Sequence, residues 1–545
     1  MRVVAGPVHS AKRPAVSPFG FALIPPLSSL NTMALQPARV STFQRFLNAV
    51  EYIGNALPQP ATLFALLGLL IILLSAVFAQ AGVQVTNPAT GQSIPAISLL
   101  NVAGLQRIIT QTLPNFINFP PLGVVIVCLL GIAVAESTGL IGAVVRLLVL
   151  AAPRALITPM VVFAGVMSNA GGDIGYVMLI PLAAAIFHSL GRHPIAGLAA
   201  AFAGVSGGFS ANLLVGTIDV LLAGLTQSAA SIIKPDYVVT GVANYYFMVV
   251  ATFVVTGVGT WVTHRFVEPR LGPYRGDAKP EPLVPLSAAE KRGLLWTLIF
   301  SVAAIGFVLW GLLPETGFLR DPKQTTDPIL RSYFISNLVP FIFVAGLGLG
   351  LSYGLGARTI HSDTDVVRGM ERSMATLASY LVLAFFAAQF IAYFSWTNLG
   401  IITAVNGADL IRSAGLEKLP IPLMMTLIIF SAGVNLIIGS ASAKWALLAP
   451  IFVPMFMLLG YSPELVQAAY RVGDSCTNII TPLMAYFPLI LTFAARYDRQ
   501  AGIGTLIASM LPYSIAFLVT WTLLLVIWIS FGIPVGINAP LYLAR

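Results

Sequence analysis

Two short polar, glycine-rich stretches interrupt otherwise apolar sequence, and they hold residue types that can bind a solute or an ion. The first runs from Met167 to Asp173 and the second from Gly439 to Trp445. Their hydroxyl, amide and carboxylate groups supply hydrogen-bond partners and oxygen ligands. Backbone in the hydrocarbon of a bilayer leaves the helix only where it is buried in protein or lines a wet cavity. We therefore expect a binding site near the membrane midplane.

A second small-polar break follows each of these stretches, from Gly207 to Asn212 and from Gly473 to Asn478. The breaks occupy corresponding places in the two halves of the chain. Transporters built from internal repeats have such paired interruptions around their binding site. The pattern predicts a membrane transporter with two structurally related halves.

Arg471 and Asp474 are three residues apart, so on a helix they share a face. They can form a mutually neutralising structural pair. Alternatively, the Arg471 guanidinium binds the carboxylate of an anionic substrate. Asp474 is then either the partner of Arg471 in the empty state or a proton acceptor.

Two further carboxylates lie close to the breaks, and each has a structural interpretation. Asp173 can cap the returning helix of the first hairpin, and Asp219 follows a glycine where a broken helix restarts. If a proton drives transport, one of these carboxylates or Asp474 takes it up. If sodium drives transport, its ligands are backbone carbonyls at the breaks and the side chains of Ser168, Asn212, Ser440 and Asn478.

Neutral polar residues at the breaks can be helix caps, substrate ligands or both. Trp445 can stack on an aromatic ring of the substrate or pack inside the protein. The residues expected to contact substrate are Ser168, Asn169, Asn212, Asp219, Ser440, Ser442, Trp445, Arg471, Asp474 and Asn478. The residues expected to couple transport to an ion are Asp173, Asp219, Asp474, Asn212 and Asn478.

Composition places the chain in a membrane. Of 545 residues, 57% are hydrophobic and 9% are charged, and the mean hydropathy is +0.89. A chain of this length cannot cover a soluble fold with so little polar surface, so it is a polytopic membrane protein. The net charge of +9 fits cytoplasmic loops that face anionic lipid, and no nucleic acid is implied. No H-E-x-x-H helix is found, so we do not expect an enzyme, and no P-loop is found, so we do not expect ATP-driven transport. No cofactor is expected.

With the basic residues placed inside, the chain forms about nine membrane-spanning helices and two re-entrant hairpins that open from opposite faces. The predicted fold is an all-α polytopic membrane protein with an inverted-topology repeat. Its predicted parts are a disordered or amphipathic cytoplasmic extension (1–50), a first half (51–265) with a hairpin at about 155–190, a cytoplasmic linker (266–292), a second half (293–535) with a hairpin at about 421–460, and a C-terminal tail (536–545).

Two segments are expected to be loops between spans, and a third is expected to lie outside the membrane. Residues 82–119 and 398–420 are assigned to the outside, and the segment that holds Arg358, Arg368 and Arg372 is assigned to the inside. Glu136 is expected at a helix end rather than in the site.

Six strings resemble the AbgT family, the p-aminobenzoyl-glutamate transporters of the larger ion transporter superfamily. They are Ser168–Val177, Gly191–Pro194, Gly207–Leu214, Ser440–Trp445, Tyr470–Ser475 and Asn478–Pro488, within a similarity that extends from about Glu51 to Ile533. The resemblance implies nine spanning helices, two hairpins and a homodimer built on a scaffold region. It also implies, in a bacterial inner membrane, import of p-aminobenzoyl-glutamate or efflux of sulfonamide antimetabolites, driven by an ion gradient.

Family positions associated with transport fall here on Asp219, Ser442, Trp445, Pro463, Arg471, Asp474 and Pro482. Pro482 thereby joins the expected substrate-contacting residues, and Asp173 competes with Asp219 for its role. An alternative function is a sodium-coupled dicarboxylate importer of the same superfamily, and a more distant one is a membrane-embedded enzyme. The direction of transport stays open.

Overall fold

The computed structural model describes residues 58–86, 91–280, 285–323, 328–329, 332–499 and 501–543. All of them belong to one compact unit, which covers 47–545. The predicted N-terminal extension, 1–50, lies outside the described residues.

The described part of the chain is almost entirely helical, with one small sheet. The first half contains α2 (Pro60–Gln80), β1 (Gln84–Thr86), β2 (Ser93–Pro95), α3 (Val102–Ile117), α4 (Pro120–Ser137), α5 (Leu140–Leu150), η1 (Arg154–Leu156), α6 (Ile157–Ser168), η2 (Asn169–Gly171), η3 (Gly175–Leu179), α7 (Ile180–Ser189), α8 (Pro194–Phe202), η4 (Ala203–Gly207), α9 (Thr217–Ala230), α10 (Tyr245–Val262), η5 (Thr263–Val267) and α11 (Glu268–Leu271). The second half contains α12 (Ala288–Leu312), α13 (Tyr333–Ser336), α14 (Leu338–Ala357), α15 (Asp363–Thr376), α16 (Ala378–Trp396), α17 (Leu399–Ser413), α18 (Pro420–Ile437), α19 (Ala441–Leu458), α20 (Pro463–Asn478), α21 (Phe487–Ala495) and α22 (Ile503–Ser530).

Nine helical stretches in the described residues are long and apolar enough to cross a membrane. This confirms the predicted class of an all-α polytopic membrane protein. Helix starts follow local chemistry: α2, α4, α18 and α20 carry proline in the first turn, where a missing N–H costs nothing. Ser287 and Ser462 accept hydrogen bonds as N-caps of α12 and α20.

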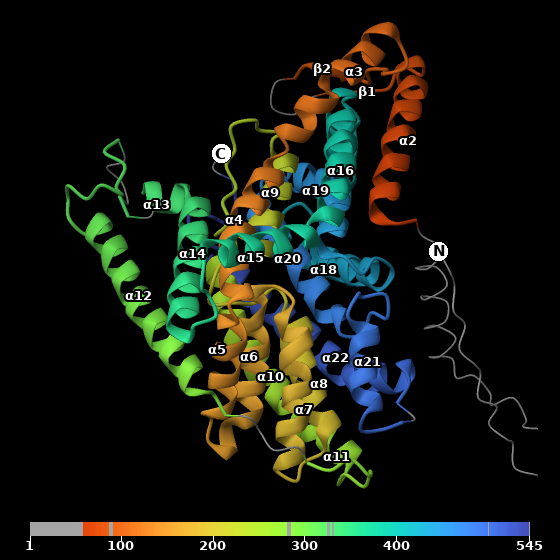
Figure 1. Cartoon of the computed structure of the whole chain (residues 1–545). Helices are drawn as coiled ribbons and strands as arrows, with labels where there is room; N and C mark the ends of the chain where they lie inside the picture. The colour runs from red at the N-terminus through yellow and green to blue at the C-terminus, as the bar shows by residue number, and fades with distance from the viewer. Residues whose placement is uncertain are drawn as a thin grey trace, which may run out of the picture. The chain divides into compact units, whose positions relative to one another are not determined.

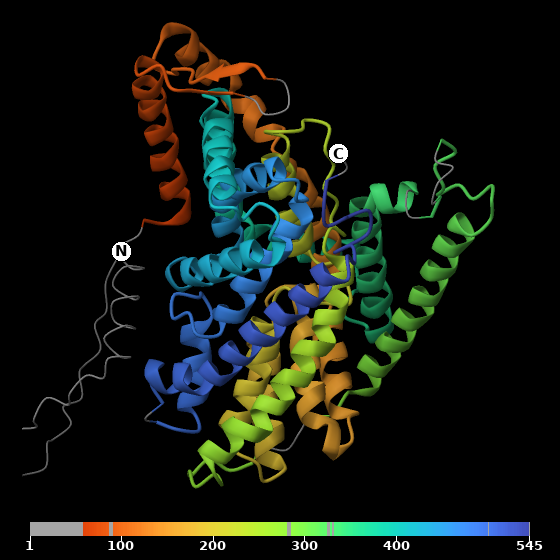
Figure 2. The ribbon, with the colours of Figure 1, turned by 180° about the vertical axis from the view of Figure 1, so that it is seen from behind.

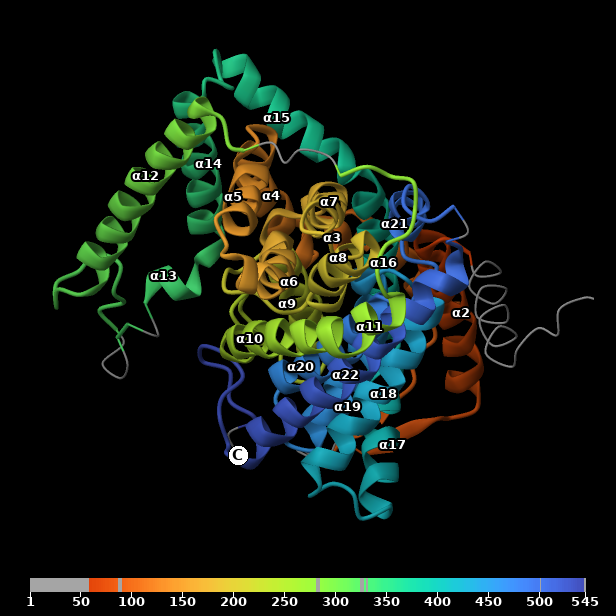
Figure 3. The same ribbon diagram turned by 90° about the horizontal axis from the view of Figure 1, so that it is seen from below.

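The figures show how these helices are arranged. The pair α12 and α14 flanks α4 on one side of the unit (Figure 1). From behind and from below, α10 and α22 lie side by side (Figures 2 and 3). The amphipathic helix α15 packs against α4. In addition, α10 packs against α6, and α22 packs against α18.

The first hairpin consists of α6 and of η3 continued by α7, joined by a non-α turn. The chain bends by 118° between α5 and the segment Arg154–Gly171. Gly165 and Gly204 let α6 approach η4 closely, since a Cβ on Gly204 would lie 2.3 Å from the Val162 carbonyl oxygen. The hairpin spans Ile157–Ser189, close to the predicted 155–190.

The second hairpin consists of α18 and α19, separated by three non-helical residues, Ile438 to Ser440. The Ser440 hydroxyl accepts a hydrogen bond from the Ala443 N–H at 3.4 Å and caps α19. These helices span 420–458, close to the predicted 421–460. The opposite entry of the two hairpins stays a prediction.

A broken helix follows each hairpin, but the second break lies later than predicted. The first half leaves the helix between η4 and α9, which includes most of the predicted Gly207–Asn212 break. In the second half, Gly473–Asn478 is helical, and the chain leaves the helix only between α20 and α21. The small residues serve close packing instead, because a Cβ on Gly473 would lie 2.3 Å from the Ile428 carbonyl oxygen of α18.

Gly473→Val is therefore expected to lower the free energy of unfolding by about 1–3 kcal/mol, because it forces α18 and α20 apart. The measurement is thermal unfolding of the purified protein in detergent. Gly433→Val is the matched control, since a Cβ on Gly433 of α18 meets nothing within 4 Å. Equal stability of the two variants would contradict the close approach.

Two predicted loops, and the segment 398–420 that was predicted to lie outside, contain regular structure. Residues 82–119 hold the antiparallel pair β1–β2 and the helix α3. Most of 398–420 is α17, which packs on α19. The segment with Arg368 and Arg372 is α15, where N–H groups of His361 and Ser362 donate to the Asp365 carboxylate and lower its pKa. The sequence analysis did not identify these helices, because their low hydropathy hides them from a search for spans.

Candidate functional site

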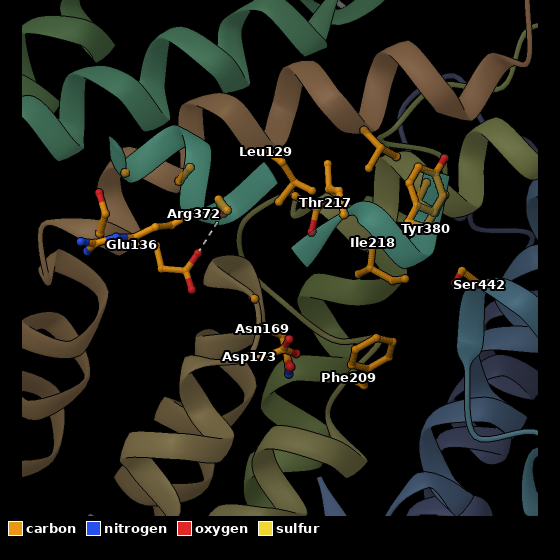
Figure 4. Close-up of a pocket in the computed structure, with 18 residues that line it drawn as sticks. Leu129, Glu136, Asn169, Asp173, Phe209, Thr217, Ile218, Arg372, Tyr380 and Ser442 are labelled. Carbon is orange, nitrogen blue, oxygen red and sulfur yellow. Dashed lines mark hydrogen bonds between the residues drawn. The ribbon is translucent and has the colours of Figure 1, made fainter. Parts of the chain in front are cut away.

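The two hairpin tips border a pair of adjoining cavities of about 540 and 650 Å³. Both cavities are lined by Asp173, Phe209, Ile218, Tyr380 and Ser442, so they are two adjoining parts of one site. Opposite the tips stand side chains of α4, α15 and α16. Figure 4 shows this arrangement for the 540 Å³ cavity, with Asn169 and Asp173 below α4.

Five of the predicted polar residues line this space: Asn169, Asp173, Ser440, Ser442 and Asn478. They come from both hairpins and from the end of α20. The site thus combines groups from both halves of the chain, as an internal-repeat transporter requires.

Aromatic side chains form much of the remaining wall. Phe209 and Tyr380 line both cavities, and Tyr176 and Tyr486 line the larger one. The rings of Tyr176 and Tyr486 stack at 4.5 Å between centroids with planes 8° apart. This pair joins the first hairpin to the segment that follows α20. Such a wall suits an aromatic or partly apolar ligand.

Three charged side chains line the smaller cavity: Glu136, Asp173 and Arg372. Glu136 lies near the C-terminal end of α4, as predicted, but it also faces the cavity, so its exclusion from the site was wrong. The Ser373 hydroxyl donates to its carboxylate at 3.4 Å. Asp173 is exposed at the first tip, and no side-chain cap to η3 is formed. The predicted capping role of Asp173 is therefore not observed.

Arg471 and Asp219 form a buried ion pair behind the cavity. Arg471 Nη2 lies 2.5 Å from Asp219 Oδ1, and both side chains are 3% exposed. The second carboxylate oxygen accepts a hydrogen bond from the Gly216 N–H at 2.7 Å, at the start of α9. Asp219 thus caps the restarting helix, as predicted, and neutralises Arg471 as well.

Lys444 and Asp474 form a second buried pair. Lys444 Nζ lies 2.5 Å from Asp474 Oδ1, with side-chain exposures of 0% and 1%. The ammonium also donates to Asn435 Oδ1, and the Asn435 amide donates to the Asp474 carbonyl oxygen at 2.7 Å and to Asn478 Oδ1 at 2.8 Å. Both arms of the second hairpin are thereby tied to α20.

The expected pairing of Arg471 with Asp474 is therefore not observed. Although the two residues share α20, each finds its counter-ion on another element. Helix spacing places side chains on one face but does not decide which charges meet. In this structure Arg471 is also closed off from the cavity.

Trp445 is completely buried and does not face the cavity. Its ring stacks on Tyr470 at 4.4 Å, and its Nε1 donates to the Thr226 hydroxyl at 2.8 Å. Of the two interpretations of Trp445, the structure has packing inside the protein.

Trp445→Phe is expected to leave the KM for an aromatic substrate within about twofold of wild type and to cost about 1–3 kcal/mol of stability, because the Thr226 hydrogen bond is lost and a smaller ring occupies the buried site. Trp445→Ala should cost about 3–5 kcal/mol, because it opens a cavity. Flux assays and thermal unfolding measure both effects. A tenfold rise of KM in Trp445→Phe without loss of stability would contradict the packing role.

The remaining predicted residues form hydrogen bonds with backbone groups or lie at helix ends and breaks. Ser168 donates to the Gly165 carbonyl oxygen at 2.7 Å, and Asn212 donates to the Val166 carbonyl oxygen at 3.2 Å and accepts from the Leu214 N–H at 3.0 Å. Pro463 opens α20, and Pro482 lies in the non-helical segment after it. These contacts hold the breaks in place.

The sequence analysis did not identify Asn435 as a buried polar partner, and it assigned no role to Lys444. A signal for both exists, since Lys444 is the sole charged residue between Pro420 and Ser462 and Asn435 the sole asparagine of α18. An isolated polar group in an apolar hairpin requires a buried partner. Arg372 and Tyr380 were missed because α15 and α16 were treated as a loop and an ordinary span.

Comparisons with known proteins agree with this architecture. The profile of the AbgT putative transporter family matches residues 45–543. The p-aminobenzoyl-glutamate transport protein of Escherichia coli (strain K12) is 38% identical over 487 residues, which cover 89% of this chain and 95% of that protein.

Two solved structures are similar throughout. The YdaH transporter of Alcanivorax borkumensis has a TM-score of 0.83 and 46% identity, covering 88% of this chain and 100% of that one. MtrF of Neisseria gonorrhoeae, described as illuminating a class of antimetabolite efflux pumps, has a TM-score of 0.86 and 50% identity, covering 91% and 100%.

Proposed function

Because the chain belongs to the AbgT putative transporter family, we propose that it is a secondary active transporter for p-aminobenzoyl-glutamate, related aromatic carboxylates or sulfonamide antimetabolites. It is a multi-pass membrane transporter and not an enzyme. A proton or sodium gradient across the bacterial inner membrane drives it, and its N-terminus is cytoplasmic. Like the relatives, it moves a small molecule. The protein works as a homodimer.

The observation that carries this proposal is the cavity between the hairpin tips and α4, α15 and α16. Its two parts, of about 540 and 650 Å³, each lie in the range of small-molecule sites. Its wall combines aromatic rings with amide and hydroxyl groups, which suits a ligand with an aromatic ring and polar ends. The substrate contacts are Asn169, Ser440, Ser442 and Asn478, at the cavity.

The N-terminus of α19 supports binding of an anionic group. Ser440 and Ser442 begin this helix and line the cavity. Free N–H groups and the helix dipole make a helix N-terminus attractive to anions. Transporters commonly use the ends of broken helices in this way.

Ion coupling uses the carboxylates of Asp173, Asp219 and Asp474. Asp173 is exposed to the cavity, whereas the other two are engaged with buried cations. Protonation of a paired carboxylate would free its cation and loosen the contact that it holds. The hairpins then move relative to the opposite wall and expose the cavity to the other side.

Flux in proteoliposomes tests the proposal. Radiolabelled p-aminobenzoyl-glutamate and a sulfonamide are offered under a proton gradient or a sodium gradient, each imposed separately. We expect flux that follows one gradient and stops when that gradient is dissipated. Absence of flux for both solutes under both gradients would contradict the substrate assignment and leave the fold unaffected.

A further inference from the structure

Arg372 is the cation that the smaller cavity exposes. It lies near the end of α15, is exposed, and lines the cavity together with Glu136 and Asp173. Among the described residues it has neither an ion pair nor a hydrogen-bond partner for its side chain. A guanidinium held at a cavity without a counter-ion is available to a ligand.

The other cations near the hairpin breaks are not available. Arg471 is 3% exposed and paired with Asp219, and Lys444 is 0% exposed and paired with Asp474. A substrate carboxylate could reach either cation only by displacing a buried protein carboxylate. Such a displacement leaves a charge uncompensated inside the protein, which is costly.

We propose that Arg372 binds a carboxylate of the substrate, an assignment that rests on the proposed function. Its planar fork matches a carboxylate with two parallel hydrogen bonds. Figure 4 shows Glu136 and Arg372 at one end of the cavity and Tyr380 and Ser442 at the other. A ligand that is charged at one end and aromatic at the other fits between them.

The neighbouring acids make binding of an anion depend on Arg372. Glu136 and Asp173 line the same cavity and repel a substrate carboxylate. Without the guanidinium, a substrate carboxylate at this end of the cavity faces Glu136 and Asp173 with no cation beside it, whereas an uncharged ligand loses little. Arg372 therefore sets the preference of the site for anionic over neutral substrates.

The test compares Arg372→Gln with Arg368→Gln, which removes an exposed arginine one turn earlier on α15 that lines neither cavity. Binding of p-aminobenzoyl-glutamate, a dicarboxylate, and of uncharged sulfanilamide to the purified protein is measured by calorimetry. We expect Arg372→Gln to weaken p-aminobenzoyl-glutamate binding at least about tenfold, as for loss of a charged hydrogen bond. Sulfanilamide binding stays within about twofold, and Arg372→Lys recovers part of the loss.

The possible results distinguish the role of Arg372 from the proposed function of the protein. Equal affinities in Arg372→Gln and Arg368→Gln would overturn the role of Arg372 and leave the proposed function standing. An equal loss for both ligands would overturn it too, because a carboxylate receptor must discriminate by charge. Failure of the wild-type protein to bind either ligand would overturn the proposed function, and the assignment of Arg372 with it.

Discussion

Lys444→Met is expected to lower the free energy of unfolding by about 3–5 kcal/mol and to abolish transport, because it leaves a buried carboxylate without its counter-ion. Asp474 is 1% exposed and lies 2.5 Å from the lysine Nζ. The substitution also removes the donor to Asn435, the residue that links α18 to α20. Unfolding in detergent and flux in proteoliposomes measure the two effects.

A double variant separates the effect on stability from the effect on ion coupling. Lys444→Met combined with Asp474→Asn places no charge in the pocket, so most of the lost stability should return. Transport should stay absent, because the proposed ion coupling needs the carboxylate. Wild-type stability of Lys444→Met alone would contradict the buried pair, and wild-type flux in the double variant would give Asp474 a structural role only.

The fold was largely predictable because its signals are local. Apolar runs long enough to span a bilayer, and the polar residues that interrupt them, can be read along the chain without knowing what packs where. The first hairpin was predicted at about 155–190 and extends from Ile157 to Ser189. The helices α3, α15 and α17 were missed because they are amphipathic or moderately polar, and hydropathy alone does not distinguish such helices from loops.

The sequence predicted several of the polar residues that line the site, but not which charged residues form ion pairs. Residue types at the breaks identified the polar groups that line the cavity, such as Asn169 and Ser442. The partner of Arg471, in contrast, is 252 positions away, whereas the expected partner is three positions away. Which carboxylate meets the guanidinium depends on how α9 of the first half packs on α20 of the second. Spacing along one helix carries no information about such contacts.

The Arg471–Asp219 pair crosses between the two halves of the chain, and Asp219→Asn tests what it contributes. The substitution keeps an oxygen that can accept from the Gly216 N–H but removes the charge that neutralises Arg471. We expect a loss of about 3–5 kcal/mol in the free energy of unfolding, because the guanidinium is left buried and uncompensated. Asp219→Ala should cost about 1 kcal/mol more, because the cap of α9 is lost as well.

Asp236→Asn is the matched control, since Asp236 is an exposed acid in the turn after α9. Its effect should stay within about 0.5 kcal/mol. Wild-type stability in Asp219→Asn would contradict the ion pair, and equal losses in the Asn and Ala variants would contradict the cap. If both contacts hold as the geometry indicates, the same carboxylate fixes where α9 begins and how the two halves meet. Its protonation would then weaken the contact between the halves while the Gly216 hydrogen bond persists, which is the property required of a residue that couples an ion to their movement.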